Sequence, residues 1–202
     1  MIRRRRLLQM SPGVAAAALA GCSAPPASYY RIIPVPGAVL HTGAETIRVR
    51  EIGVPGYLLQ NGIAQASGSY QLVTAANALW AEPLPAMLQA VLVQNLTQRL
   101  PQMIVTGSSG MVGTPADVLV EIDVLRFDPD SSGRVVLIAQ AALKSAADDR
   151  FLTTRTLQSS AAPASADMPG MMAAMSTLWA GLADDLAQLI AEEPVALPRE
   201  QG

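Results

Sequence analysis

Side chains that could carry out chemistry are scarce in this sequence. Its 202 residues include one cysteine, Cys22, and one histidine, His41. A single cysteine excludes an internal disulfide framework and a cysteine zinc cluster. A single histidine excludes most sites that depend on several imidazoles. Four uses remain for Cys22: nucleophile, metal ligand, half of an intermolecular disulfide, or inert packing.

His41 lies in the segment Val-Leu-His-Thr-Gly, which we expect to be a loop. A serine hydrolase could use this imidazole as its base, but the sequence has no Gly-x-Ser-x-Gly elbow to present a nucleophile. The Gly- and Ser-rich stretch at 107–116 lacks the Lys-Ser/Thr ending of a phosphate-binding loop. We therefore interpret His41 as a solvated or capping residue.

Carboxylates occur as neighbours at 148–149, 184–185 and 192–193. Adjacent side chains on a helix point in different directions, so solvated faces are favoured over metal sites. Asp128 and Asp130 frame a turn but lack the further oxygen ligands of a calcium cage. We predict no catalytic residue, no metal site and no cofactor. The formal charge of −2 does not favour a nucleic-acid partner.

The residues before Cys22 are typical of an export signal. Arg3 to Arg6 are followed by a mostly apolar stretch that ends in small residues. Leu-Ala-Gly-Cys at 19–22 resembles the lipobox of bacterial lipoproteins. This resemblance implies cleavage before Cys22 and a diacylglycerol on its thiol. We thus expect a signal peptide at 1–21 and a lipidated tether at 22–28.

The resemblance to the lipobox also suggests which membrane the protein reaches. Ser23 follows the cysteine. Gram-negative lipoproteins with Asp at this position tend to stay at the inner membrane, whereas Ser is similar to the pattern sent to the outer membrane. Two or three acyl chains give stable anchoring. We expect a lipid-anchored envelope protein that faces the periplasm at the outer membrane, with the Sec or Tat route left open.

A single domain is expected at 29–193, with a flexible tail at 194–202. Alternating apolar residues predict strands at 29–33, 45–52 and 71–74, with a brief continuation at 57–59 and a short strand at 104–105. An antiparallel meander is predicted at 118–127, 134–144 and 150–156, followed by a loop at 158–167. Helical spacing predicts helices at about 82–100 and 168–191. The simplest arrangement is an α/β fold with three layers, in which two main helices pack on one mixed sheet.

Four methionines mark the last predicted helix: Met168, Met171, Met172 and Met175. Their helical spacing favours a role as core residues. The alternative is that these adaptable side chains line a lipid-binding groove.

Two stretches carry a family resemblance. Ile47 to Ile63 reads IRVREIGVPGYLLQNGI, and Trp80 to Leu84 reads WAEPL at the start of the first helix. They resemble the PqiC/YmbA family of ABC-type transport auxiliary lipoproteins. Leu79 replaces a basic residue usual in that family, and 64–69 lacks an expected arginine. The lipobox, the later hairpin and the closing helix are similar to that family's layout.

The resemblance implies a fold similar to anticodon-binding-like domains and a non-catalytic lipoprotein. Its partners would be an MCE-type (mammalian-cell-entry) transport protein and ABC transporter components, in support of envelope integrity. Whether the chain forms homo-oligomers is left open. The alternatives are a periplasmic lipid-binding carrier and an envelope hydrolase that uses a serine and His41.

The motif residues also have a structural interpretation. Trp80 would anchor the helix entry in the core, Glu82 would favour the positive end of the helix, and Pro83 would fix its first turn. The functional alternative places Tyr57 and Trp80 near a partner surface, where amphipathic aromatic residues are enriched.

Overall fold

The computed structural model describes residues 26–41, 43, 45–68, 70–108 and 115–192. Cys22, the predicted signal peptide and most of the predicted tether therefore lie outside the described residues, as do residues 193–202. In the described ranges, the helices are too short or too polar to cross a bilayer.

A five-stranded sheet forms the larger part of the fold, in the order β5-β2-β6-β7-β8. The expected meander is confirmed as β6 (Val118–Pro129), β7 (Val135–Ser145) and β8 (Phe151–Ala161), paired antiparallel. β2 (Thr46–Val49) lies parallel to both β6 and β5 (Ile104–Gly107), which makes the sheet mixed. The strand β8 continues to Ala161, so the loop predicted from 158 begins later than expected.

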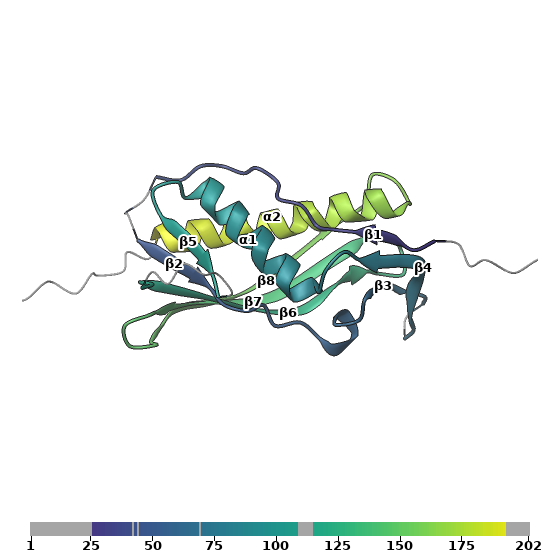
Figure 1. Ribbon diagram of the computed structural model, residues 1–202, viewed down its shortest axis with the longest axis horizontal. Helices are drawn as coiled ribbons and strands as arrows, with labels where there is room; N and C mark the ends of the chain where they lie inside the picture. The colour runs from purple at the N-terminus through teal and green to yellow at the C-terminus, as the bar shows by residue number, and fades with distance from the viewer. Residues whose placement is uncertain (1–25, 42, 44, 69, 109–114, 193–202) are drawn as a thin grey trace, which may run out of the picture.

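Both predicted helices are present, as α1 (Leu84–Arg99) and α2 (Met168–Glu192). Figure 1 shows them against each other on the same side of the larger sheet. Burial agrees, because alternate residues of β7 are buried while Gln140 between them is exposed. Met171, Met172 and Met175 are buried in the core, as the favoured interpretation of the methionines required.

The remaining strands form a separate three-stranded sheet, in the order β1-β4-β3. It contains β1 (Ser28–Tyr30), β3 (Gly62–Ala66) and β4 (Leu72–Trp80). Our expectation of one sheet was therefore wrong in this respect, while the α/β class, the mixed pairing and the two packed helices are confirmed. Three extra residues of β4 bulge between its pairings with Gly62 and Ala64, and Asn77 there has φ 55°.

Two local expectations also change. Residues 57–59 do not continue the strand, because Gly56–Leu58 form a short 3-10 helix, η1. Pro83 is the residue that caps α1, just before its first turn, and Pro85 lies inside that turn. Proline suits both places because the first helical turn does not need its N–H groups.

Residues 31–41 connect β1 to β2 without forming a strand or helix. We call this segment the strap. In Figure 1 it runs along the helices, on the side away from the larger sheet.

Candidate functional site

Tyr57 joins η1 to the end of β6. Its hydroxyl donates to Asp128 Oδ2 at 2.5 Å, and the guanidinium of Arg126 donates to Oδ1 at 3.0 and 3.1 Å. Burial raises the pKa of Tyr57 well above its usual range, and the hydrogen bond to Asp128 raises it further. The hydroxyl thus stays protonated and acts as a structural donor. The cluster borders a shallow groove that Tyr70 and Leu72 also line.

Trp80 is a core residue, with 5% of its surface exposed. Its backbone N–H donates to the carbonyl of Asn61, while its indole Nε1 finds no hydrogen-bond partner in the described part of the chain. Glu82 and Pro83 are exposed where α1 begins. These positions favour the structural interpretation of Trp80. A partner role for Tyr57, Glu82 or Pro83 stays a prediction.

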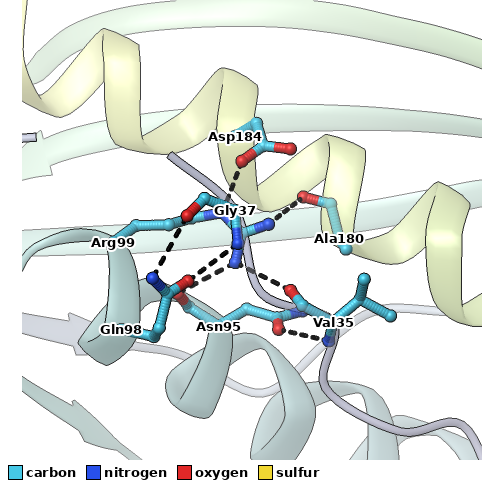
Figure 2. Close-up of polar contacts among 7 residues, drawn as sticks. All are labelled: Val35, Gly37, Asn95, Gln98, Arg99, Ala180 and Asp184. Atoms are coloured by element: carbon cyan, nitrogen blue, oxygen red, sulfur yellow. Dashed lines mark hydrogen bonds and ion pairs between the residues drawn. The ribbon is translucent and has the colours of Figure 1, made fainter. Parts of the chain in front are cut away.

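The strap is fixed to the helices by its backbone. Gly37 exchanges two hydrogen bonds with the side-chain amide of Gln98, at 2.9 and 3.1 Å (Figure 2). The N–H of Val35 donates to Asn95 Oδ1 at 3.1 Å, and that of Ile33 donates to Ser176 Oγ at 3.1 Å. Polar side chains on both helices therefore pair with the backbone N–H and C=O groups of the strap, which has no neighbouring strand to pair with.

Arg99 lies at the centre of this arrangement and is fully buried. Its Nε donates to Asp184 Oδ1 at 2.6 Å, and its two terminal nitrogens reach the carbonyls of Val35, Asn95 and Ala180 at 3.2 Å (Figure 2). One guanidinium thus joins α1, α2 and the strap. The planar fork of arginine donors suits this geometry, which lysine could not reproduce.

Sequence reasoning missed this cluster and treated Asp184 and Asp185 as one solvated pair. That interpretation was wrong for Asp184, whose side chain is 43% exposed but ion-paired to Arg99. It holds for Asp185, which is exposed. The available signal was a single basic residue in the last turn of an otherwise uncharged helix.

The face of the larger sheet away from the helices carries a charge network. Glu121 pairs with Arg50 at 2.7 Å and with Lys144 at 3.3 Å. The Lys144 ammonium also lies 4.4 Å from the ring centre of Phe151. Lys144 also pairs with Asp149 at 3.5 Å. Arg50, Glu121 and Phe151 line a shallow hollow on that face.

Little in the described ranges resembles a reaction centre. No group of three or more His, Cys, Asp or Glu side chains gathers there in a metal-binding arrangement. His41 is exposed in a loop. The predicted lipidation site, Cys22, lies outside the described residues and stays a prediction.

Comparisons with known proteins agree on one family. The model of the ABC-type transport auxiliary lipoprotein component family matches residues 30–187. The chain is 33% identical over 129 residues to the intermembrane transport lipoprotein PqiC of Escherichia coli K12, a match that covers 61% of this chain and 67% of that protein. The PqiC of Shigella flexneri gives the same values.

Solved structures share the fold. A crystal structure of an uncharacterized protein has a TM-score of 0.70 at 25% identity and covers 82% of this chain and 99% of its own. The crystal structure of a Xanthomonas campestris protein of the family model DUF330 has a TM-score of 0.67 at 20% identity. It covers 83% of this chain and 96% of its own. The sequence stretches that contain Tyr57 and Trp80 predicted membership of this family, and the comparisons confirm it. The chain belongs to the family of ABC-type transport auxiliary lipoprotein components.

Proposed function

We propose that this chain is a non-catalytic auxiliary subunit of an intermembrane lipid transport system, anchored in the outer membrane through Cys22. The observation that carries the proposal is the family match over residues 30–187, which begins shortly after the lipobox. The name of the E. coli relative, intermembrane transport lipoprotein, supports a place between two membranes.

The partners we propose are an MCE-domain transport protein and the ABC transporter components that work with it. Contact between proteins, with no bond made or broken, would be the mechanism. One observation supports it: among the described residues, no helix covers the sheet face that carries the Glu121 network. Periplasmic exposure would leave that face available to a partner.

The test is co-purification from cells that express the full chain at native level. After mild cross-linking, the chain should recover an MCE-domain protein. An outer-membrane lipoprotein of another family, solubilised in the same way, is the matched control. Failure to recover an MCE-domain protein above that control would contradict the proposed partnership.

A second readout concerns the envelope. Deletion of the gene should sensitise cells to detergents that the outer membrane normally excludes, and the wild-type chain should restore resistance. A Cys22→Ala chain should restore much less. Full rescue by this variant would show that anchoring at Cys22 is dispensable.

A further inference from the structure

The smaller sheet ends in an exposed apolar tip. Tyr70 is completely exposed, and Leu72 and Val73, where β4 begins, expose 47% and 38% of their surfaces. We call these three residues the tip patch. In Figure 1, β3 and β4 lie at the opposite end of the molecule from β2 and β5. Exposed apolar residues that gather at one end are typical of contact sites rather than of scattered surface residues.

The sequence around the tip patch carries no charge. Between Glu51 and Glu82 there is no Asp, Glu, Lys, Arg or His, and this interval contains both β3 and β4. The adjacent β1 and the residues from Cys22 to Tyr30 are also uncharged. Charged residues border this uncharged segment: Arg126, Asp128 and Asp130 line the groove that Tyr70 and Leu72 also line, and Arg31 follows β1. An uncharged tip that carries an aromatic residue and has charged groups beside it suits the interface between headgroups and acyl chains.

The position of β1 relates this tip to Cys22. β1 pairs parallel with β4, with Ser28 opposite Ala78. It therefore enters the sheet from the end of β4 that carries Leu72 and Val73. Residues 23–27 alone separate Cys22 from β1. Since an extended chain spans at most about 3.5 Å per residue, the thiol lies within roughly 20 Å of Ser28.

The two segments have the same number of residues. Cys22 precedes Ser28 by as many residues as Leu72 precedes Ala78, the register partner of Ser28. Because β4 bulges between Thr74 and Leu79, a tether extended along β4 would reach at least as far as the tip patch. From this geometry we infer that the tip patch inserts into the surface of the lipid bilayer that holds the anchor, so that the domain stands on its smaller sheet. The inference rests on the proposed anchoring at Cys22.

Tryptophan fluorescence tests the contact directly. Tyr70→Trp is compared with Ile104→Trp, because Ile104 is 55% exposed on β5 at the other end of the molecule. Lipidated protein is reconstituted in phosphatidylethanolamine–phosphatidylglycerol vesicles that contain brominated lipid. Trp80 and Trp179 emit as well, so the spectrum of the wild-type chain is subtracted from that of each variant. The tryptophan at 70 should then show blue-shifted and quenched emission, while the tryptophan at 104 should emit as in water. Equal quenching at the two positions would overturn the inference.

A second anchor separates this inference from the proposed lipidation. Cys22 is replaced by a polyhistidine tag bound to nickel-chelating lipid, and the two tryptophan variants are compared again. Quenching confined to position 70 would support the tip contact even if mass spectrometry finds no lipid on Cys22. Lipid on Cys22 with an unquenched tip would retain the anchor and overturn the contact. Leu72→Asp, at a half-exposed position, should abolish most of the quenching without unfolding the domain.

Cross-linking in cells identifies the occupant. A photoreactive phenylalanine analogue in place of Tyr70 should form adducts with phospholipid. The same analogue in place of Ile104 should not. Adducts at position 70 with another protein or a second copy of this chain, in place of lipid, would overturn the inference.

Discussion

The Nε atom of Arg99 lies 2.6 Å from Oδ1 of Asp184, and this ion pair joins the last turn of α1 to the middle of α2. The arginine is fully buried, whereas the aspartate is half-exposed and can be hydrated on one side. The pair thus lies where the two helices and the strap meet (Figure 2).

Removal of the carboxylate should destabilise the domain. Asp184→Ala leaves the buried Arg99 with carbonyl partners but no counter-charge, at an expected cost of about 2–3 kcal/mol in the free energy of unfolding. Asp185→Ala is the matched control, because it removes a neighbouring carboxylate whose side chain is exposed. The control should change stability by less than about 0.5 kcal/mol. Urea denaturation measures both, and equal losses would contradict a special role for Asp184.

Two glycines should respond to alanine with opposite signs. A Cβ at Gly37 would lie 2.3 Å from both Arg99 Nη2 and Asp184 Oδ1, so Gly37→Ala should destabilise by about 1–3 kcal/mol. A Cβ at Gly181 in α2 meets nothing within 4 Å. Gly181→Ala should therefore stabilise by about 0.5–1 kcal/mol through helix propensity. Thermal unfolding of the two variants distinguishes them, and a neutral Gly37→Ala would refute the close approach.

Tyr57→Phe should weaken the domain at neutral pH and reduce its sensitivity to alkali. Loss of the hydrogen bond to Asp128 costs about 1–2 kcal/mol at this half-buried site. Because the folded pKa of Tyr57 is raised, the unfolded chain releases this proton first, and native stability declines as pH rises above about 10. The variant lacks this contribution to the decline. Urea unfolding at pH 7 and pH 10.5 should show a smaller gap between variant and wild type at the higher pH, and a constant gap would contradict the raised pKa.

The two tryptophans offer a matched comparison of buried indoles. Trp179 Nε1 donates to the carbonyl of Leu88 at 3.0 Å, while Trp80 Nε1 has no partner in the described ranges. Trp179→Phe loses that hydrogen bond whereas Trp80→Phe loses none, so Trp179→Phe should cost about 0.5–1.5 kcal/mol more in the free energy of unfolding. Denaturant titration of the two variants measures this difference. A Trp80→Phe chain that is stable but loses its envelope partner would instead assign Trp80 to recognition.

Lipidation should depend entirely on Cys22. In cells fed labelled palmitate, the wild-type chain should carry the label and Cys22→Ala should carry none, because the sequence has no other thiol. Ser23→Asp should keep the label but move the chain from the outer to the inner membrane fraction. Retention of label by Cys22→Ala would exclude the thiol as the attachment site, while an unchanged location of Ser23→Asp would reject the proposed address.

The sequence was sufficient for the helices and the meander because their apolar residues recur with a clear period. Leu84, Leu88 and Leu92 follow the helical repeat, and Val118, Val120 and Ile122 alternate. β3 consists mostly of Ala, Gln and Gly, and the middle of β4 reads Ala-Ala-Asn-Ala. These residues have low strand propensity, and they form strands because tertiary pairing overrides that preference.

The strap and Arg99 could not be predicted for a different reason. Val35 and Gly37 receive their partners from residues about 60 positions away on α1. No local pattern encodes such pairings. Arginine near the end of a helix usually extends into water, so its burial follows from the three-dimensional position of Asp184 and the carbonyls.

The strap also determines how the domain responds to mechanical force. A pull on the tether reaches β1 first, and the parallel pairing directs it along β4, so the three register pairs resist together in shear. If they slip, the pull passes into the strap, where Val35 and Gly37 are held by α1 and by Arg99. Tension from the envelope would thus be borne by the helices before it reached β2 and the larger sheet.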